Sequence, residues 1–314
     1  MAVVILKRIV LLIPVMLVTS FLSYGLVYLS PGDPAQIILE MELQATPTQE
    51  QLLAFKQENG LDKPFLLQYA TWLNRVVHGD LGRSLTTKRE IFPVYMEKLG
   101  ATAMLFITGL ALSVAIALPL GIFSAVKANS AMDHFLRITA LGCISMPCFW
   151  WGILLVFVAS VQLRWLPAFG YGRAEHLILP VLTLGITGAM ELMRLTRTSV
   201  LEVLGQNFVR TARAKGLGEK AVLTRHVLRN AIIPVITAIG LHFSHLVGGT
   251  VLIETLFAWP GVGRYLVRAS AMRDIPVIQG VVLMSTVFFL LLNLAIDLAY
   301  TVLDPRITIK ERQR

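Results

Sequence analysis

The sequence predicts an all-α polytopic membrane protein with about six transmembrane helices. Of the 314 residues, 55% are hydrophobic and only 15% are charged, and the mean hydropathy is +0.69. These values lie well outside the usual range of a soluble domain. Six apolar stretches are each long enough for the ~20 helical residues that cross a bilayer, and no strand alternation could close a barrel. The stretches span residues 9–29, 101–126, 136–161, 177–200, 231–256 and 277–303.

The first stretch is expected to be a retained transmembrane anchor, residues 1–30. Lys7 and Arg8 stand near its start, as basic residues do in a secretory signal. However, the apolar run is longer than the about 7–15 residues of a signal core, and no small-residue cleavage site precedes Ser30. We therefore expect the segment to stay in the membrane.

Residues 31–98 are expected to form an extracytoplasmic subdomain, because they are polar and contain no stretch long enough to cross. Thr48 and Gln51 have the spacing of a capping box, which predicts a short helix ending at Gly60. A second periodic segment covers residues 65–76. This subdomain could contact a partner or simply cap the helix bundle.

Residues 99–314 are expected to form the five-helix core, with a cytoplasmic loop at about 201–230. With the N-terminus inside, more than half of the 28 Lys and Arg residues fall on the cytoplasmic side, as the positive-inside bias requires. Both termini are then cytoplasmic. This asymmetry explains the net charge of +9, and no helix-turn-helix or zinc-ligand spacing predicts nucleic acid as a partner.

The chain lacks the common signatures of catalysis. It contains no Gly-x-x-x-x-Gly-Lys-Ser/Thr loop for ATP phosphates, no His-Glu-x-x-His and no Gly-x-Ser-x-Gly. Cys143 and Cys148, the only cysteines, have no redox or zinc spacing. We therefore expect no enzyme activity, no catalytic residue and no cofactor in this chain. Active transport would need an ion gradient or ATP hydrolysis by another chain.

The basic loop is the most informative segment. It predicts a helix, a break at Gly216-Leu-Gly218, and a second helix with Glu219 in its first turn, a polarity that suits the helix dipole. Two helices at a sharp break make a rigid knob that could transmit force between chains. The alternative is that the basic residues only enforce topology.

Spacing within this loop resembles a known family. Ala212-x-Ala-x-Gly216, followed by His226-Val-Leu-Arg-Asn-Ala231 and Pro234, resembles the coupling motif of ABC importer permeases of the dipeptide, oligopeptide and nickel subgroup. Arg229 departs from the broader importer pattern, which has a proline at about that place. The likeness continues in Pro31-Gly-Asp-Pro34, Asn59-Gly-Leu-Asp-Lys-Pro64, Gly79-Asp-Leu-Gly82, Ile178-Leu-Pro180, Ala258-Trp-Pro-Gly-Val-Gly-Arg264, Arg273-Asp-Ile-Pro-Val-Ile-Gln279 and Asp304-Pro-Arg306.

The resemblance implies an ABC type I importer permease bundle in a bacterial or archaeal cytoplasmic (inner) membrane. Such a chain forms half of a pore, as a heterodimer with a homologous second permease subunit. Two ABC ATPase subunits would bind ATP and Mg, and an extracytoplasmic solute-binding protein would deliver the cargo. The residues implied in ATPase coupling are Ala212, Arg213, Ala214, Lys215, Gly216, Leu217, His226, Arg229 and Asn230.

The resemblance also implies an outer, re-entrant element near the delivered solute. A plain tight turn between spans is the alternative, because of the Pro-Gly pair. The element comprises Trp259, Pro260, Gly261, Gly263 and Arg264.

Ionisable residues within apolar spans mark candidate translocation paths, because their burial in lipid is costly. His242 and His245 lie one turn apart on one helix face and could touch a metal transiently, although a hydrogen-bonded helix contact is the alternative. No firm metal site is predicted. The candidate path residues are Glu191, His242, His245 and Glu254.

The expected cargo is nickel or a nickel chelate. Trp165-Leu-Pro-Ala-Phe-Gly-Tyr-Gly172, Met146-Pro-Cys-Phe-Trp150 and His242 resemble nickel-type permeases more than peptide-type ones. Di- or oligopeptides remain the alternative, because a binding protein chiefly selects the cargo in this subgroup. An ion-driven secondary transporter or channel is a third reading, for which no inverted repeat is visible.

Overall fold

The computed structural model describes residues 2–29 and 32–303, and the side chains of these segments except 2–12, 26–27, 34, 41–42, 241–249 and 297–303. Within the described residues the chain is helical, with turns and one isolated bridge between Arg83 and Glu90. The predicted all-α class is confirmed. The chain divides into two compact units, unit 1 (Met1–Ala101 with Pro260–Leu294) and unit 2 (Thr102–Trp259 with Ala295–Arg314).

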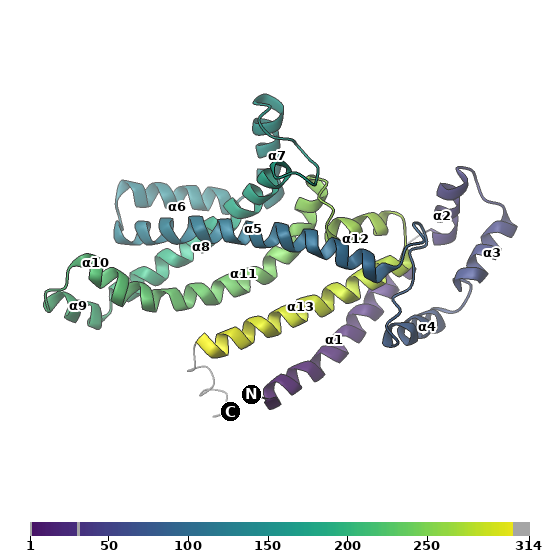
Figure 1. Cartoon of the computed structure of the whole chain (residues 1–314), viewed down its shortest axis with the longest axis horizontal. Coiled ribbons are helices and arrows are strands. Elements are labelled where there is room, and N and C mark those ends of the chain that lie inside the picture. Colours follow the sequence, from purple (N-terminus) through teal and green to yellow (C-terminus); the bar gives the residue numbers. More distant parts are fainter. Residues whose placement is uncertain (1, 30–31, 304–314) are drawn as a thin grey trace. The chain divides into compact units, whose positions relative to one another are not determined.

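Unit 1 contains the N-terminal helix and the polar segment that follows it (Figure 1). Its predicted capping box is confirmed: the Thr48 amide donates to Gln51 Oε1 at 2.8 Å, and the Gln51 amide donates to Thr48 Oγ1 at 3.3 Å. Gly60 ends that helix at φ +66°. The helices are α1 (Ala2–Leu29), α2 (Pro34–Leu43), α3 (Gln49–Asn59), α4 (Phe65–Val77), the start of α5 (Ile91–Val126), α12 (Val262–Ala271) and most of α13 (Ile275–Leu303).

A buried carboxylate ties the polar segment of unit 1 to the start of α13. Asp274 is 1% exposed. It accepts hydrogen bonds from Ser84 Oγ at 2.6 Å, from the Leu85 amide at 3.1 Å, and from the amide and hydroxyl of Thr86 at 3.2 and 2.8 Å. Beside it, Trp72, Ile91 and other apolar residues form the unit's main core.

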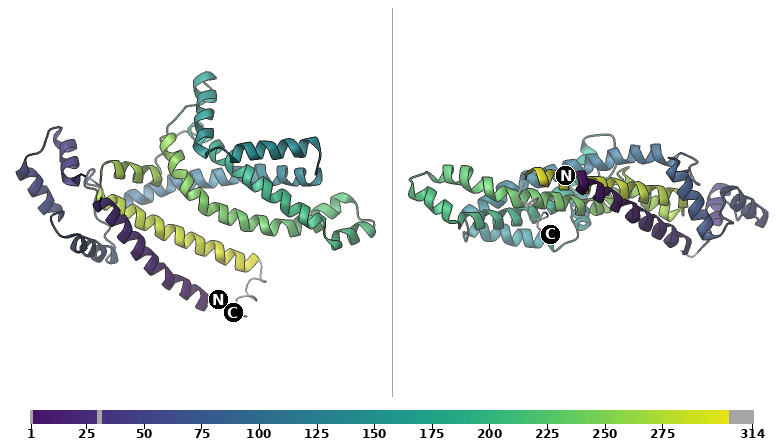
Figure 2. Two further views of the ribbon diagram at one scale, coloured as in Figure 1. Left: turned by 180° about the vertical axis from the view of Figure 1, so that it is seen from behind. Right: turned by 90° about the horizontal axis from the view of Figure 1, so that it is seen from below.

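Unit 2 is built around α8 (Glu175–Leu204), which packs against α6, α7 and α11. Helices α5, α6, α8 and α11 lie side by side, whereas the α7–η1 helix begins against α8 and α11 and its η1 end projects away from them (Figures 1 and 2). The remaining elements are α6 (Ala131–Ile144), α7 (Cys148–Leu155), the π-helical turn η1 (Val156–Gln162), α9 (Asn207–Ala214), α10 (Glu219–Ala221), the π-helical turn η2 (Val222–Val227) and α11 (Leu228–Leu256).

Glycine lets the helices of unit 2 approach closely. A Cβ placed on Gly121 of α5 would lie 2.6 Å from Thr196 Cβ and 2.8 Å from the Met193 carbonyl oxygen of α8. Such contacts are too short for any side chain. Small residues at helix crossings are how membrane bundles pack without a hydrophobic drive between helices.

Four described helices are long and apolar enough to cross a membrane, and a bent pair makes a fifth candidate. The described part of α1 adds the shorter apolar helix Ile13–Gly25. The apolar stretch 136–161, which was expected to cross the membrane, is bent: α6 and the α7–η1 helix meet at 99°. Pro147 stands at the bend, where it cannot donate a helical hydrogen bond and disfavours helix in the residue before it.

Candidate functional site

The basic knob, defined as residues 207–227, stands at one end of unit 2 and comprises α9, a turn, α10 and η2 (Figure 2). The predicted order of helix, break and helix is confirmed. One detail differs, because α10 is not a separate helix but continues through η2 into α11. The second arm of the knob is therefore the end of a membrane span.

Gly216 makes the break possible. Its φ is +79°, and its amide donates to the Arg213 carbonyl at 2.9 Å, while the Leu217 amide donates to the Ala212 carbonyl at 3.3 Å. A Cβ at Gly216 would meet nothing within 4 Å. The left-handed backbone, rather than lack of space, therefore favours glycine here.

The inner face of the knob packs onto the ends of three long helices. Val209 and Ala212 of α9, with Val222 of η2, are buried in one apolar cluster. The same cluster contains Ala125 of α5, Val200 of α8 and Ala231 of α11. We call these six residues the knob seat. Because the seat is close-packed, a force on the knob passes to the helices beneath it.

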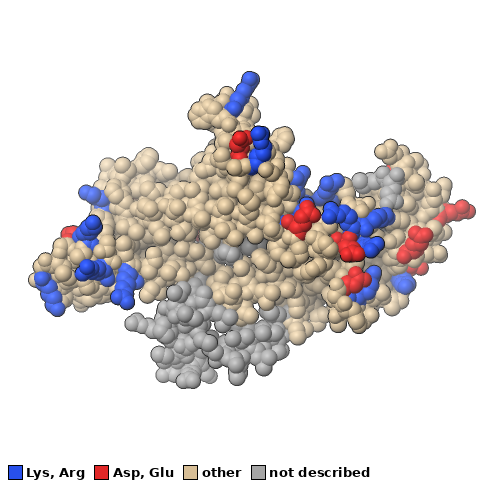
Figure 3. Space-filling view, in the orientation of Figure 1, with Lys and Arg blue, Asp and Glu red and all other residues tan. Residues whose placement is uncertain are grey.

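The outer face of the knob is exposed and basic (Figure 3). Phe208 is 44% exposed and Leu217 is 40% exposed among these cations. Exposed apolar groups within a polar rim are typical of protein interfaces. Of the predicted coupling residues, Ala212 is buried and His226 is half-buried, whereas the others are exposed: Arg213, Ala214, Lys215, Gly216, Leu217, Arg229 and Asn230.

An ion pair closes the outer side of the break. Arg213 Nε lies 2.7 Å from Glu219 Oε1, and Arg213 Nη2 lies 3.1 Å from Glu219 Oε2. The hydrogen bonds that Arg213 donates to Glu219 raise the pKa of the Arg213 guanidinium above its ordinary value. The pair is bidentate and joins α9 to α10, and both side chains are exposed.

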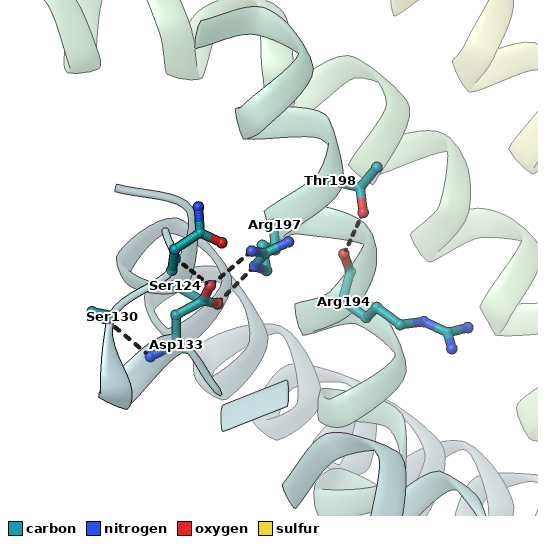
Figure 4. A network of polar contacts seen from close by, with 7 residues as sticks. Ser124, Ser130, Asp133, Arg194, Arg197 and Thr198 are labelled. Carbon is teal, nitrogen blue, oxygen red and sulfur yellow. Dashed lines mark hydrogen bonds and ion pairs between the residues drawn. The ribbon is translucent and has the colours of Figure 1, made fainter. Parts of the chain in front are cut away.

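A second arginine–carboxylate pair, which we call the latch, joins Asp133 of α6 to Arg197 of α8 (Figure 4). Arg197 of α8 donates from Nε and Nη2 to the two oxygens of Asp133, at 2.7 and 2.8 Å. Ser124 Oγ at the end of α5 and the Asn129 amide also donate to Asp133. The latch therefore joins the ends of α5, α6 and α8.

Sequence reasoning missed the latch and singled out neither Asp133 nor Arg197. One local signal was available. Ser130 caps α6 by accepting from the Asp133 amide at 3.2 Å, so a Ser-x-x-Asp pattern marked that helix start. The partner on α8 is 64 residues away in sequence, and no local pattern indicates it.

The candidate path residues occupy different environments. Glu254 is fully buried, and Thr102 Oγ1 donates to its Oε1 at 2.6 Å. Glu191 is exposed on α8. The side chains of His242 and His245 lie outside the described residues. Among the described residues, no group of three or more His, Cys, Asp or Glu could hold a metal ion.

Glu191 belongs to a polar stripe along α8. Glu191, Arg194 and Thr198 are exposed, and Thr187, one turn before Glu191, is half-buried. Their spacing of three and four residues places them on one helix face. The opposite face is buried in the bundle. Helix α8, although apolar overall, therefore has one polar face that is exposed in this chain.

The predicted outer loop is a turn followed by a helix. Trp259 is 1% exposed, and its ring packs edge-on against Tyr171 with centroids 4.8 Å apart. Ala258 has φ +55°. Pro260 is half-buried and Gly261 is the N-cap residue of α12. Also within the predicted loop, Gly263 is buried and Arg264 is exposed.

Several apolar helices that pack through small residues define a multi-span membrane protein. Residues 117–309 match the family described as binding-protein-dependent transport system inner membrane component. Residues 1–105 match the corresponding N-terminal family. The chain belongs to this family of ABC importer permeases of the inner membrane.

Relatives match along nearly the whole chain. The glutathione transport system permease protein GsiC of Escherichia coli O6:H1 (strain CFT073) is 40% identical over 306 residues, which cover 98% of this chain and 99% of GsiC. The dipeptide transport system permease protein DppB of Escherichia coli (strain K12) is 37% identical over 338 residues, with the same coverage. Neither of these two names mentions nickel.

A solved structure shares the fold. It is described as an amino acid ABC transporter with histidines, and it aligns with a TM-score of 0.50 and 14% sequence identity. The alignment covers 68% of this chain and 94% of that chain. At this identity the likeness concerns the fold alone.

Proposed function

We propose that this chain forms half of the translocation pathway of an ATP-driven importer for short peptides. The observation that most directly supports this proposal is the exposed basic knob on its buried seat. The proposed complex contains a homologous second permease, two ATPase subunits that bind ATP and Mg, and an extracytoplasmic solute-binding protein. Both termini lie in the cytoplasm, on the same side as the knob.

The knob is the proposed docking element for an ATPase. Leu217 and Phe208 supply apolar contact, and the surrounding cations supply charge. When the ATPases close around ATP, they move the knob, and the seat passes this movement to α5, α8 and α11. ATP can drive this change only if it binds the two pore states with different affinity.

Short peptides are the proposed cargo in place of nickel. The two relatives named above carry glutathione or dipeptide in their names and match almost the full chain. Both molecules are short, polar and built from amide bonds. The earlier preference for nickel rested on short sequence likenesses, and neither of these relatives supports it.

The polar stripe of α8 is the proposed lining of the pathway. A carboxylate and a guanidinium that faced lipid would cost several kcal/mol (about 3 each by insertion measurements). Glu191 and Arg194 are exposed on an apolar span, so an aqueous pathway or the second permease is the favourable neighbour. Weak polar contacts also suit a pathway, because tight sites would hold the cargo.

Cysteine labelling tests the lining role. In the assembled importer, with Cys143 and Cys148 replaced by Ala, a water-soluble maleimide should label Thr187→Cys. It should not label Ile107→Cys, which replaces an apolar residue that is 60% exposed on α5. Thiols react as thiolates, and these form in water rather than in lipid. Equal labelling of the two positions would contradict the proposal.

Reconstitution tests the importer and its cargo. The chain would be placed in lipid with its second permease, ATPases and binding protein, and ATP hydrolysis and uptake would be measured with dipeptides, glutathione or nickel. We expect peptide-dependent uptake that requires ATP. Uptake of nickel alone would show that nickel is the cargo. Uptake without ATP would contradict the proposal of an ATP-driven importer.

A matched pair of variants tests the knob. Ala214→Trp places a bulky group on the exposed knob, and it should abolish the coupling of ATP hydrolysis to uptake while the melting temperature stays unchanged. Ala128→Trp makes the same change at an exposed alanine of the α5–α6 turn, and it should transport normally. Normal transport by Ala214→Trp would rule out the docking role.

A further inference from the structure

Two cavities of unit 1 follow one another along the same three helices, α1, α4 and α13. The first is lined on α13 by Gln279 and neighbouring residues, and the second by Leu283 and Met284. On α1 the corresponding residues are Tyr24 and Ser20. Each step is four residues, or about 6 Å along a helix at ~1.5 Å per residue. The cavities are therefore neighbouring levels of one surface.

The first cavity, of about 80 Å³, is basic. Lys63 and Arg75 line it, and no Asp or Glu is among its described lining residues. Within the described part of the chain, neither cation forms an ion pair. Two positive charges that share a small cavity without a counter-ion favour an anion there.

Two buried hydrogen-bond donors of the same cavity lack partners. Trp72 and Gln279 line the cavity and are 4% and 2% exposed. Within the described residues, neither Trp72 Nε1 nor Gln279 Nε2 has a hydrogen-bond partner. An unsatisfied buried donor costs about 1–3 kcal/mol. By contrast, Gln68 in the same wall is fully used, because it bonds Tyr24 and the carbonyls of Leu61 and Lys63. The two unpartnered buried groups of this cavity are both donors, which suits an oxyanion.

The second cavity, of about 380 Å³, is an apolar groove. Leu17 of α1, Val76 of α4 and Leu283 of α13 lie along it. Its level is the deeper one, because it follows α1 toward the middle of its apolar stretch. A groove of this lining beside a membrane helix suits a hydrocarbon chain.

Aromatic residues place these cavities at the membrane interface. Phe21 and Tyr24 of α1 contact Phe65 and Tyr69 of α4 edge-on, at centroid distances of 5.2 to 5.8 Å. Such clusters gather where hydrocarbon meets head groups. Helix α4 is amphipathic and leaves Val77 76% exposed, as helices that lie in the interface do.

We propose that unit 1 binds one anionic phospholipid. The phosphate occupies the basic cavity, where Arg75, Lys63 and the two unpartnered donors hold it, and an acyl chain follows the apolar groove. Basic cavities between membrane helices bind acidic head groups in the same way. The proposed orientation places the lipid in the outer leaflet. The site itself does not depend on the transported cargo.

Native mass spectrometry of the full-length chain in detergent tests this site. Phosphatidylglycerol would be titrated against phosphatidylcholine, with glycerol phosphate as a soluble head group. We expect phosphatidylglycerol to bind more tightly, and Arg75→Gln to weaken it about tenfold, because a charged hydrogen bond is lost. Arg83→Gln is the matched control, since Arg83 is an exposed arginine of the same unit, and it should bind as the unchanged chain does.

The groove has its own variant. Leu17→Trp fills it and should weaken phosphatidylglycerol without changing the binding of glycerol phosphate. If Leu17→Trp has no effect, and glycerol phosphate binds as tightly as the lipid, a free phosphate is the occupant and the lipid proposal fails. It also fails if Arg75→Gln leaves lipid binding intact but weakens docking of the binding protein, because the cavity would then hold a protein carboxylate.

Discussion

Two arginine–carboxylate pairs of unit 2 have the same geometry and different surroundings. In both, the arginine Nε lies 2.7 Å from a carboxylate oxygen and a second nitrogen completes a bidentate contact. In the latch, the side chains of Arg197 and Asp133 are 15% and 0% exposed. On the knob, those of Arg213 and Glu219 are 43% and 72% exposed. Burial rather than distance therefore distinguishes them.

The difference assigns different roles to the two pairs. Water screens the knob pair and can replace either partner, so that pair shapes the break with little effect on stability. The latch is out of water, and removal of one partner leaves a buried charge without its counter-ion. The latch thus holds the helix ends that support the seat, while the knob surface stays free for a partner.

Asp274 of unit 1 adds a third case, a buried carboxylate held by neutral donors. Its four hydrogen bonds come from two hydroxyls and two amides. The dipoles of these donors stabilise the buried Asp274 carboxylate, as the Arg197 guanidinium stabilises that of Asp133. No single substitution among these donors removes all of the stabilisation.

The largest expected effect is that of Arg197→Met. The change keeps the volume but leaves Asp133 buried without its cation, which should lower the free energy of unfolding by about 3–5 kcal/mol. Equilibrium unfolding in mixed detergent micelles measures it. Arg194→Met, an exposed arginine one turn earlier on α8, is the control and should have a much smaller effect.

A double variant sharpens this result. Asp133→Asn combined with Arg197→Met removes both charges, so it should be less destabilised than the sum of the two single variants. Strict additivity would show that the latch contributes no coupling and would remove the contrast with the knob.

A smaller effect is expected for Asp274→Asn. The Asn oxygen can still accept from the Leu85 amide, and the hydroxyls of Ser84 and Thr86 can rotate to accept from the new NH₂ group, but the Thr86 amide loses its acceptor. The expected loss is about 1–3 kcal/mol, measured as above. Asp80→Asn is the control, because Asp80 is exposed and accepts from the Gly82 amide at 2.7 Å. A loss as large as that of Arg197→Met would contradict the view that distributed dipoles tolerate neutralisation.

The smallest effect is expected for Arg213→Gln. The pair it breaks is exposed, so the melting temperature in detergent should not change measurably. Lys215→Gln, which removes a neighbouring exposed cation, is the control for charge alone. A clear drop in melting temperature for Arg213→Gln only would show that the bidentate contact itself holds the knob together.

Features with local causes could be predicted from the sequence. The capping box at Thr48, the helix end at Gly60 and the break at Gly216 each depend on a few neighbouring residues. The latch and the Asp274 cluster could not be predicted in this way, since their partners lie 64 and 190 residues apart. A proline disfavours helix in the residue before it, but the 99° angle at Pro147 depends on how α7 packs against α8.

The candidate site also has features that the sequence predicted and features that only the packed structure shows. The resemblance placed the coupling residues in the knob, yet only the packed helices separate the buried Ala212 from the exposed Ala214. Glu191 and Glu254 were indistinguishable as ionisable residues in spans, and the structure buries one and exposes the other. The burial of a side chain depends on the residues that surround it in space, and the sequence alone does not show which residues these are.

By itself the sequence determined the membrane class, most of the apolar spans, the polar segment after the first helix and the break of the knob. Hydropathy, helix caps and the preference of glycine for left-handed backbone depend on residues close together in the chain, so they can be predicted from the sequence. Only the tertiary structure decided which charged groups are buried away from water and which helices contribute residues to the knob seat. It also decided which hydrogen-bond donors of unit 1 have no partner. Those outcomes depend on segments far apart in the chain, because removal of water from a charge requires surrounding groups from several helices.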